Sequence, residues 1–487
     1  MAKDRRFNKV LLFILPDFLV NISSIPERPY SGIGYIAEAL GAEGIVVKGI
    51  DCRFDPSLQS LFSAIREFQP DIIGTTIGTK AFRRKYKVAE RIKKEFPYLP
   101  ILFGGPHVEC YGARLMEEAL SVDFAIVGEG ERAVVRLCNE ANENVPNLYY
   151  RDSGQVKFTY RDDFIQNLDS LGFPKFRAFD MSLYPDKVIS LYTSRGCYGN
   201  CTFCTVGQSM GKKMRGRSVE SVTDEVRYWY TKGIRDFYVN DDMFVFSRKR
   251  VTAICEAFRR EFPDIELRLN NGVRADRVDY EMLKQMYDAG FRRVSYGVES
   301  ANDDILKHIK KGETLDEIKE AVRLSVEIGY HVNLFNILGL PYETPEHIMR
   351  TIQYAAESGA NTAEFFNLIP YPGTELYKWA VSNGYLLWAE NDDYLNLVDC
   401  DKDHVGIPVL NTPELSYDQR VALSRVAEKA AIDIAYAGHS KILRKKLGFL
   451  LGYLSSYLYN NRLVRRLTRD SFFFNKMVRK IRGILRV

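Results

Sequence analysis

Cysteine is scarce in this sequence, with eight residues in a chain of 487. That is too few for a disulfide scaffold in so long a chain. Three of the eight lie between positions 197 and 204, which is the spacing of metal ligands. A chain with few cysteines, some of them clustered, is typical of a reducing compartment, so we expect a cytoplasmic protein.

Long hydrophobic runs are absent as well. No stretch of about 18 apolar residues occurs, so no membrane-spanning helix is expected. The apolar run 10–15 follows basic residues and superficially resembles a secretory signal, but Pro16 and Asp17 interrupt it and no small-residue cleavage site follows. We therefore expect a buried first strand, with a signal peptide as the alternative.

The sequence also lacks low-complexity segments and a convincing short-period repeat. A content of 46% hydrophobic and 27% charged residues is that of a globular protein. The length suffices for two or three domains. The formal net charge of +5 is unevenly distributed, because 13 Lys or Arg and one acid lie from residue 441 onward. The basic character therefore belongs to the C-terminal tail.

Short apolar runs alternate with amphipathic stretches from residue 9 to about 150. Apolar strands separated by amphipathic helices predict a doubly wound α/β domain over residues 1–150, with a parallel sheet covered on both faces. Ligands of such sheets bind beyond the carboxyl ends of the strands. The predicted strands are 10–15, 45–50, 72–76, 101–103 and 124–127, and the predicted helices are 34–43, 57–68, 83–96 and 114–120.

A second ladder of the same kind follows a segment without sustained periodicity. Residues 151–187 are predicted to be a linker on the surface. Residues 188–390 contain six predicted parallel strands with helices between them, which suggests a partial (β/α)6 barrel. The pattern is then mainly helical over 391–440, and a basic amphipathic tail is predicted over 441–487. The predicted barrel strands are 188–193, 236–239, 266–270, 293–297, 331–337 and 363–369.

The loop after the first barrel strand contains the most specific motif of the chain. Cys197, Cys201 and Cys204 have the spacing Cys-x3-Cys-x2-Cys, and Gly196 and Gly199 give the loop backbone freedom. Such a loop can bind three corners of a cubane iron–sulfur cluster and leave the fourth iron open. Zinc is the alternative, but a structural zinc site needs a fourth ligand that this loop does not contain.

In this strand-loop context, residues 188–377 resemble the radical S-adenosylmethionine (SAM) superfamily. The resemblance implies a [4Fe–4S] cluster whose open iron binds the amino and carboxylate groups of SAM. One-electron reduction then gives methionine and a 5′-deoxyadenosyl radical. It also implies an electron donor of the flavodoxin or ferredoxin type.

The same resemblance assigns SAM contacts to side chains and loops at the strand ends. The backbone of Phe203 corresponds to the adenine contact, and Asp241 and Asp242 lie where many members have a Gly-Gly-Glu motif that reaches the amino group of SAM. Glu299, followed by Ser300, corresponds to the acceptor of the ribose hydroxyls. Phe203 and the aspartates have plainer explanations, since a phenylalanine ring can belong to the core and adjacent aspartates are common in turns. A carboxylate at the carboxyl end of a barrel strand, such as Glu299, seldom serves packing.

A loop of the family's SAM side follows the fifth predicted strand. It contains Gly339 and Pro341, and the next strand is followed by a similar segment, 370–374. Glycine and proline alone predict only turns. Their order after successive strands favours the SAM interpretation.

The first ladder resembles the cobalamin-binding domain that precedes the radical SAM core in one large subgroup. The likeness rests on Gly104, Gly105 and His107 after one strand and on Gly128 and Glu129 after the next. Two adjacent glycines allow a close approach of the backbone to the nucleotide tail of cobalamin.

Asp51 marks a departure from one cobalamin motif. Proteins that ligate cobalt from below carry Asp-x-His-x-x-Gly, whereas Asp51 is followed by Cys52 and Arg53 without a histidine. Many enzymes of the subgroup lack this histidine, so we expect cobalamin with no protein imidazole on cobalt. His107 is the only histidine before residue 150, and we expect a structural role or a contact with the cofactor tail.

The combined resemblance implies a cobalamin-dependent radical SAM methyltransferase that methylates an unactivated carbon of a small-molecule or lipid-like substrate. The alternatives are a radical SAM enzyme that catalyses cyclisation or rearrangement, and a cobalamin-responsive or scaffold protein without catalysis, which the three intact cysteines oppose. An RNA methylthiolating enzyme would carry a further cysteine cluster and a basic β-barrel, and neither is evident. A nucleic-acid partner is therefore not expected.

The tail over 441–487 has its own pattern. Its apolar stretch, 447–459, is too short to span a bilayer, and the basic residues beyond it alternate with apolar ones as in amphipathic helices. Basic amphipathic helices lie at membrane surfaces, so peripheral contact at the cytoplasmic face is one interpretation. A helical cap packed on the barrel and RNA binding are the others.

Overall fold

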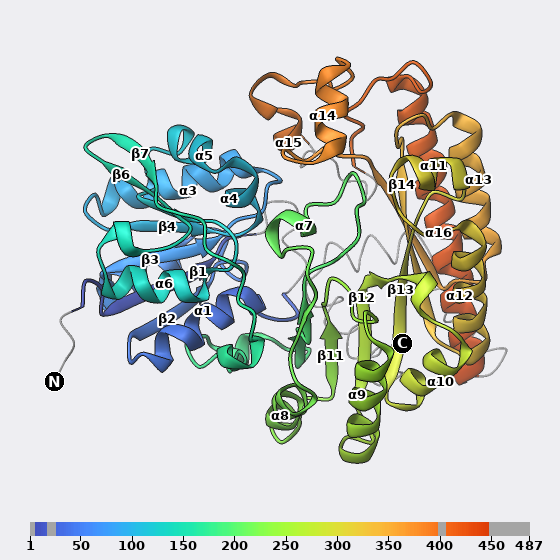
Figure 1. Ribbon diagram of the computed structural model, residues 1–487, viewed down its shortest axis with the longest axis horizontal. Coiled ribbons are helices and arrows are strands. Elements are labelled where there is room, and N and C mark those ends of the chain that lie inside the picture. Colours follow the sequence, from blue (N-terminus) through green and yellow to red (C-terminus); the bar gives the residue numbers. More distant parts are fainter. Residues whose placement is uncertain (1–4, 17–25, 398–405, 448–487) are drawn as a thin grey trace. The chain divides into compact units, whose positions relative to one another are not determined.

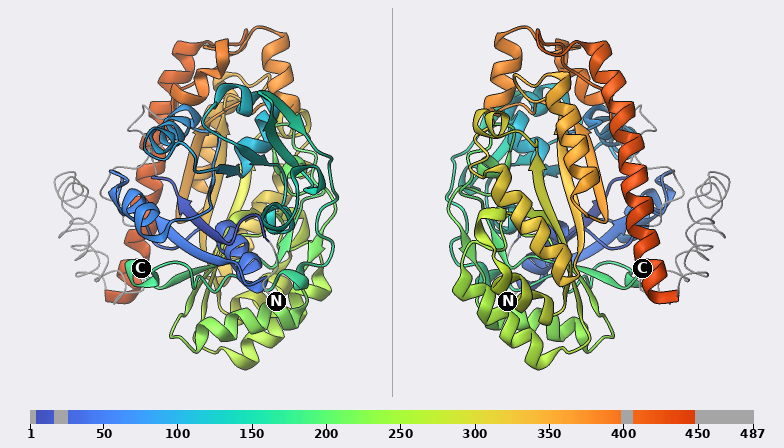
Figure 2. Two further views of the ribbon diagram at one scale, coloured as in Figure 1. Left: turned by 90° about the vertical axis from the view of Figure 1, so that its left-hand side faces the viewer. Right: turned by 90° about the vertical axis from the view of Figure 1, so that its right-hand side faces the viewer.

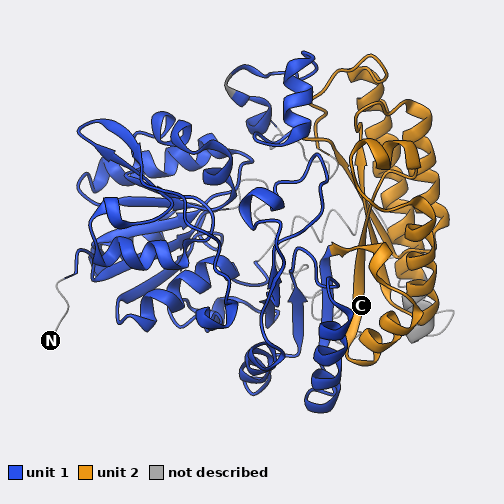
Figure 3. Cartoon of the chain, in the orientation of Figure 1, with its two compact units in different colours: residues 1–19, 26–271, 370–400 blue, residues 20–25, 272–369, 401–487 orange. Residues whose placement is uncertain are grey.

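The computed structural model describes residues 5–16, 26–397 and 406–447. The chain divides into two compact units (Figure 3). Unit 1 is Met1–Leu19, Pro26–Asn271 and Pro370–Cys400, and unit 2 is Val20–Ile25, Gly272–Ile369 and Asp401–Val487. The two units reflect contacts within the chain. They do not test the predicted segments 1–150, 151–187, 188–390, 391–440 and 441–487, so the limits of those segments stay predictions.

Unit 1 begins with a seven-stranded sheet of order β2-β1-β3-β4-β5-β6-β7. Its first five strands pair in parallel. The side chains of β1 are buried after the first position, as expected for a strand covered on both faces. These strands are β1 Lys9–Ile14, β2 Val46–Asp51, β3 Ile72–Thr76, β4 Ile101–Gly104 and β5 Phe124–Ile126.

Helices cover both faces of this sheet. Helices α1 and α6 lie on one face, and α3, α4 and α5 lie on the other (Figure 1). Helix α3 shows why: its buried side chains include Phe82, Tyr86 and Ala89, while lysines and arginines occupy the rest of its surface. The predicted doubly wound fold is confirmed. The helices are α1 Ser31–Ala42, α2 Gln59–Phe68, α3 Phe82–Glu95, α4 Pro106–Tyr111, α5 Ala113–Glu118 and α6 Gly130–Asn139.

The start of the predicted linker belongs to a β-hairpin that sequence reasoning missed. Strands β6 Leu148–Asp152 and β7 Gln155–Phe158 pair antiparallel and extend the sheet. The turn residues Ser153 and Gly154 both have positive φ, 51° and 82°. Two-residue hairpin turns of type I′ require positive φ at both positions, so the Ser-Gly pair was the available signal.

The remainder of unit 1 contains the first half of the second ladder. Strand β11 pairs in parallel with both β8 and β12. A short antiparallel pair, β9 with β10, follows β8. The strands are β8 Val188–Leu191, β9 Ser194–Arg195, β10 Arg215–Gly216, β11 Asp236–Val239 and β12 Glu266–Val273, and the helices are α7 Val206–Ser209, α8 Val219–Tyr230, α9 Arg248–Glu261, α14 Glu375–Ser382 and α15 Tyr394–Leu397.

Unit 2 contains the other three parallel strands, with β14 between β13 and β15. The long helix α16 lies against β15 and α13 (Figure 2). The six strands and their helices are the βα units of the predicted partial barrel, and a helical C-terminal region follows them. The elements are β13 Phe291–Glu299, β14 His331–Leu338, β15 Thr362–Asn367, α10 Tyr280–Asp288, α11 Asp303–His308, α12 Leu315–Ile328, α13 Pro345–Glu357 and α16 Tyr417–Leu447.

Short 3-10 turns occur in both units. They are η1 Asn142–Asn144, η2 Leu168–Leu171, η3 Met181–Leu183 and η5 Glu390–Asp392 in unit 1, and η4 Ala275–Arg277 in unit 2.

No helix among the described residues is long and apolar enough to cross a membrane. Most of the predicted amphipathic tail, residues 448–487, lies outside the described residues.

Candidate cofactor sites

The three motif cysteines lie in one closed loop of unit 1. Pairing of Arg195 with Arg215, and of Ser194 with Gly216, brings both ends of the loop together. Within the loop, the Cys197 amide donates to the Gly211 carbonyl at 3.1 Å. The residue before Cys197 must be glycine, because it has φ +96° and a Cβ there would lie 2.6 Å from the carbonyl oxygen of Lys213.

The thiol groups of this loop are neighbours. A Cβ atom at Gly199 would lie 3.3 Å from Sγ of Cys197 and 4.0 Å from Sγ of Cys201. Burial, together with the negative charges of Cys201 and Cys197, raises the pKa of Cys204 to about 11. Binding to iron stabilises thiolates, so a cluster would offset this cost.

No three His, Cys, Asp or Glu side chains in the described ranges form a group suited to one metal ion. A cubane cluster offers three separate iron atoms, so its three ligands need not meet at one point. The donor set of three thiols fits a [4Fe–4S] cluster. Phe203 is half-buried in the turn between the second and third cysteines, which the Cys204 amide closes by donating to the Cys201 carbonyl at 3.2 Å.

The adjacent aspartates after β11 have different environments. The buried Asp241 carboxylate accepts hydrogen bonds from the Thr193 amide at 2.6 Å and the Ser194 hydroxyl at 2.6 Å. The Asp242 carboxylate accepts one from the Gly196 amide at 3.1 Å, and burial raises its pKa to about 6. The Asp241 carboxylate therefore holds the start of the cluster loop through hydrogen bonds to Thr193 and Ser194.

Asp242 also lines a cavity of about 340 Å³ within unit 1. Four of the residues predicted to contact cobalamin, Gly104, Gly105, Gly128 and Glu129, line the same cavity. Further lining residues from the first sheet and its helices include Tyr35, Thr75, Thr76, Gly130 and Glu131, and those from the second ladder include Tyr192, Arg195, Asn240 and Asn271. The structure therefore brings the ends of strands from both ladders to one cavity.

The glycine pair shapes one wall of this cavity. Gly105 has φ +96°, and a Cβ there would collide with Oγ1 of Thr76, so only glycine fits. A Cβ at Gly104 would meet only the Ile126 carbonyl oxygen, at 3.9 Å, so the backbone there borders open space. A cradle of bare backbone fits the close approach of a large flat cofactor such as cobalamin.

Two predicted cobalamin contacts lie elsewhere. His107 is fully buried, 2.7 Å from the Tyr86 hydroxyl and stacked on Phe82, and burial lowers its pKa to about 3. Asp51 forms an ion pair with Arg53 at 2.6 Å and accepts from the Tyr184 hydroxyl at 2.6 Å. Neither residue is part of the cavity lining.

Unit 2 contains the remaining residues that were predicted to contact SAM. Glu299 ends β13 with φ +60°, and its carboxylate forms an ion pair with Lys311 at 3.0 Å. Ser300 donates from its hydroxyl to the buried Glu343 carboxylate at 2.9 Å. The Gly339 amide donates to the same carboxylate at 2.8 Å, so Glu343 joins two of the predicted SAM segments.

The loop containing Gly339 and Pro341 is also held by the C-terminal helix. The Arg420 guanidinium of α16 donates to the Gly339 carbonyl at 3.0 Å. Burial raises the pKa of Glu343 to about 7 and lowers that of Arg420 to about 10. Sequence reasoning missed both residues, although Glu343 lies only two positions after Pro341.

Two family descriptions match the chain. The radical SAM superfamily matches residues 191–355, and the B12 binding domain matches residues 26–138. An uncharacterized methyltransferase of Pyrococcus horikoshii is 30% identical over 98% of each chain. Cytidylyl-2-hydroxyethylphosphonate methyltransferase of Streptomyces wedmorensis is 26% identical over 78% of this chain and 83% of its own. An anaerobic magnesium-protoporphyrin IX monomethyl ester cyclase of Cereibacter sphaeroides is 28% identical over 76% of this chain and 63% of its own.

Solved structures share the fold. The cobalamin-dependent SAM radical enzyme OxsB, with aqua-cobalamin and SAM bound, matches with a TM-score of 0.67 at 18% identity, over 98% of this chain and 75% of its own. The radical SAM methyltransferase TsrM of Kitasatospora setae, with tryptophan substrate and a SAM analog bound, matches with a TM-score of 0.67 at 18% identity, over 77% of this chain and 76% of its own. The near full-length relative and the two matched domains show that this chain belongs to the radical SAM enzymes with an N-terminal B12-binding domain, whose cofactors are a [4Fe–4S] cluster, SAM and cobalamin.

Proposed function

We propose that this protein is a cobalamin-dependent radical SAM methyltransferase that methylates a carbon atom of a small molecule. The observation that carries the proposal is the cavity that Gly104 and Gly105 of the first sheet share with Asp242 of the second ladder. Cobalamin supplies the methyl group, and SAM on the cluster supplies a radical that abstracts hydrogen. Both cofactors act on one substrate atom, so their sites must open to each other.

The residues of the chain have distinct proposed tasks. Cys197, Cys201 and Cys204 hold three irons of the cluster, and the closed loop between β9 and β10 keeps them together. Gly104 and Gly105 provide backbone against which cobalamin lies. Asp242 faces the cavity as a carboxylate that can accept hydrogen bonds from the ammonium group of SAM.

Unit 2 supplies the other proposed SAM contacts. Glu299 accepts from the ribose hydroxyls, and Ser300, Gly339 and Pro341 form the neighbouring loops. The buried Glu343 keeps two of these loops in register, because it accepts from Ser300 and from the Gly339 amide. The backbone of Phe203 contacts adenine.

Cyclisation or rearrangement without methyl transfer is the second candidate, since three of the relatives are anaerobic magnesium-protoporphyrin IX monomethyl ester cyclases. Methyl transfer is favoured because the relative that the chain matches over 98% of both lengths is a methyltransferase, whereas the chain covers 63% to 76% of the cyclases. We also propose that the carbon atom that accepts the methyl group is unactivated. A flavodoxin or ferredoxin is the proposed electron donor for the cluster.

A membrane-surface location is a separate proposal that rests on the charge of the tail. Thirteen Lys or Arg and one acid lie from residue 441 onward. Each basic residue near an anionic bilayer contributes about 1 kcal/mol. Sedimentation with anionic liposomes, comparing the full chain with one that ends at residue 440, tests it. Loss of binding on truncation supports a lipid-like substrate at the cytoplasmic face, and equal sedimentation contradicts it.

The main experiment follows the two products of SAM. The reconstituted full chain is incubated with SAM and a reductant, with and without methylcobalamin, and 5′-deoxyadenosine and S-adenosylhomocysteine are quantified. Methyl transfer predicts both products, and the second only when cobalamin is present. Formation of deoxyadenosine alone under all conditions would favour the cyclase alternative.

Substitution of the cluster cysteines tests the assignment of the ligands. Each of Cys197→Ala, Cys201→Ala and Cys204→Ala removes one of only three ligands, so we expect loss of cluster absorption and of deoxyadenosine. Cys110→Ala is the control, because Cys110 lies in α4, outside the cluster loop. Full cluster content in any of the three variants contradicts the assignment.

A further inference from the structure

Arg195 joins the cluster loop to the edge of the N-terminal sheet. Its guanidinium forms two ion pairs, one with Glu129 at 2.6 Å and one with Glu131 at 2.7 Å. Arg195 lies in β9, two positions before Cys197, while Glu129 and Glu131 lie at the start of α6, directly after β5. All three charged residues line the cavity proposed for cobalamin.

The other end of the cluster loop is fastened to the same carboxylate. Arg215, which pairs with Arg195 across β9 and β10, donates to both oxygens of Glu129, at 2.9 and 2.8 Å. Two arginines and two glutamates therefore form a group without net charge. Their side chains are between 2% and 11% exposed, so solvent screens these ion pairs little.

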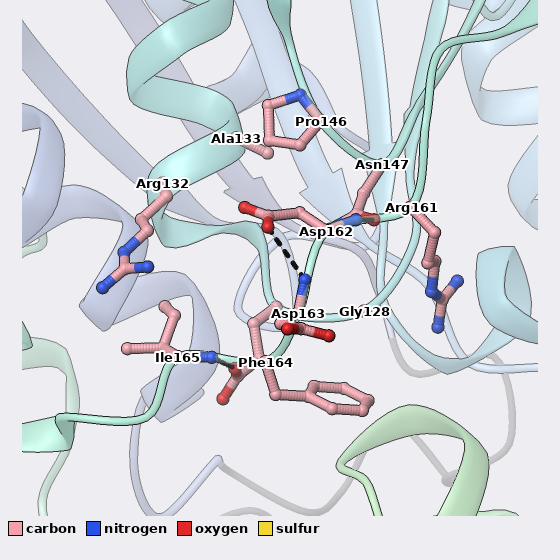
Figure 4. A pocket seen from close by; sticks show the side chains of 11 residues that line it. Gly128, Arg132, Ala133, Pro146, Asn147, Arg161, Asp162, Asp163, Phe164 and Ile165 are labelled. Carbon is pink, nitrogen blue, oxygen red and sulfur yellow. Dashed lines mark hydrogen bonds between the residues drawn. The ribbon is translucent and has the colours of Figure 1, made fainter.

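The predicted linker encloses the group on one side. The Ile165 amide donates to Glu129 at 2.6 Å. Figure 4 shows Asp163, Phe164 and Ile165 beside Gly128. The pocket between them is only about 10 Å³, at the lower limit of space for one water molecule. The linker thus packs closely over Glu129.

In a buried group of four hydrogen-bonded charges, a movement that separates one member from its partners leaves a charge buried and unpaired. Such a movement is costly, so the group has one favourable arrangement. The group therefore keeps the cluster loop in one position relative to Gly128–Glu131 at the cobalamin cavity. In a methyltransferase the radical and the methyl donor must approach the same carbon atom. A displacement of about 1 Å is sufficient to cost about 100-fold in rate.

We propose that Arg195 is a positioning residue that couples radical formation at the cluster to methyl transfer, acting through Glu129 and Glu131. This inference rests on the proposed methyltransferase function. It assigns Arg195 no contact with the reacting atoms. Its role is to hold the cluster loop and the cobalamin cavity at a constant separation.

Arg195→Lys is the informative variant. Lysine keeps the positive charge, but it is a point charge that cannot replace a planar guanidinium between two carboxylates. We expect cluster content and deoxyadenosine formation to remain close to those of the unmodified protein. The ratio of S-adenosylhomocysteine to deoxyadenosine is expected to fall about tenfold or more.

Arg227→Lys is the matched control. Arg227 also joins two carboxylates, Asp224 and Glu261, but its side chain is 46% exposed and lies on α8. Its replacement should leave the product ratio unchanged. If Arg195→Lys does not fold, Glu131→Gln removes one carboxylate of the group and keeps Arg195 paired with Glu129, and the same fall in the ratio is expected.

A spectroscopic readout separates positioning from general stability. Pulsed electron paramagnetic resonance of the reduced cluster and cob(II)alamin reports the distribution of distances between the two centres. We expect a broader distribution in Arg195→Lys than in Arg227→Lys. An unchanged ratio and distribution in a folded Arg195→Lys protein overturn the inference, whereas absence of S-adenosylhomocysteine in the unmodified protein overturns the proposed function itself.

Discussion

Asp241 holds Thr193 at two points, because its carboxylate accepts hydrogen bonds from both the backbone amide, at 2.6 Å, and the hydroxyl group of that residue. Thr193 follows β8 and Asp241 follows β11. The two strand ends are therefore fastened together directly before the cluster loop.

The pair Asp241 and Asp242 offers a matched test. Asp241→Asn leaves one acceptor oxygen for three donors, so we expect a loss of about 1–3 kcal/mol in the free energy of unfolding and less bound cluster. Asp242→Asn replaces a partly buried carboxylate that accepts a hydrogen bond from one backbone amide, so stability should change little while the affinity for SAM falls. Thermal unfolding and equilibrium dialysis with SAM measure the two effects. Equal loss of stability in both variants would contradict the distinction.

The glycine pair separates folding from cofactor binding. Gly105→Ala forces a side chain onto φ +96° and against Thr76, and we expect it to destabilise the protein by about 1–3 kcal/mol. Gly104→Ala places a methyl group in the open space of the cavity, so cobalamin affinity should fall without loss of stability. Denaturant unfolding and retention of cobalamin on gel filtration provide the measurements. Tight cobalamin binding by Gly104→Ala would show that the cofactor does not lie against this wall.

Much of the fold follows from local patterns, and much of the site does not. The strands 72–76 and 236–239 were predicted with their observed bounds, because buried parallel strands are short apolar runs between polar turns. The motif of three cysteines is likewise local. In contrast, Arg195 and Glu129 are 66 positions apart, and no periodicity links them.

The environment of a side chain in the folded protein decides the roles that the sequence pattern did not predict. Asp241 and Asp242 are identical in type and adjacent, and only the structure shows that one is occupied by Thr193 and Ser194 while the other faces the cavity. The signals that were available for the missed group were modest: an arginine before the cluster motif, and two glutamates separated by one glycine after a strand.

Glu343 makes the stability of unit 2 depend on pH. Burial raises its pKa to about 7 from the ordinary value of 4.5. Between these two pH values the folded state binds more protons than the unfolded state, so this contribution to stability is present below pH 4.5 and lost as pH rises through 7. In denaturant unfolding, Glu343→Gln should therefore gain about 1–3 kcal/mol relative to the unmodified protein between pH 5 and pH 8. The exposed Glu357→Gln on α13 is the control, and the same pH response in both variants would contradict the assignment.

Cobalt should carry no imidazole from the protein. His107 is the only histidine before residue 150. It is buried among Phe82, Tyr86 and Tyr111 and is not part of the cavity lining. Electron paramagnetic resonance of cob(II)alamin bound to the full chain is expected to lack superhyperfine splitting from a protein nitrogen, and an unchanged spectrum in His107→Phe is the control. Nitrogen splitting that disappears in His107→Phe would refute this.

The origin of the methyl group tests the central claim without knowledge of the substrate. The reconstituted full chain is incubated with SAM that carries a trideuterated methyl group, with hydroxocobalamin and with a reductant, and the protein-bound cobalamin is analysed by mass spectrometry. We predict methylcobalamin that carries the three deuterium atoms, in step with formation of S-adenosylhomocysteine. Bound cobalamin that stays unlabelled while deoxyadenosine accumulates would contradict the assignment as a methyltransferase.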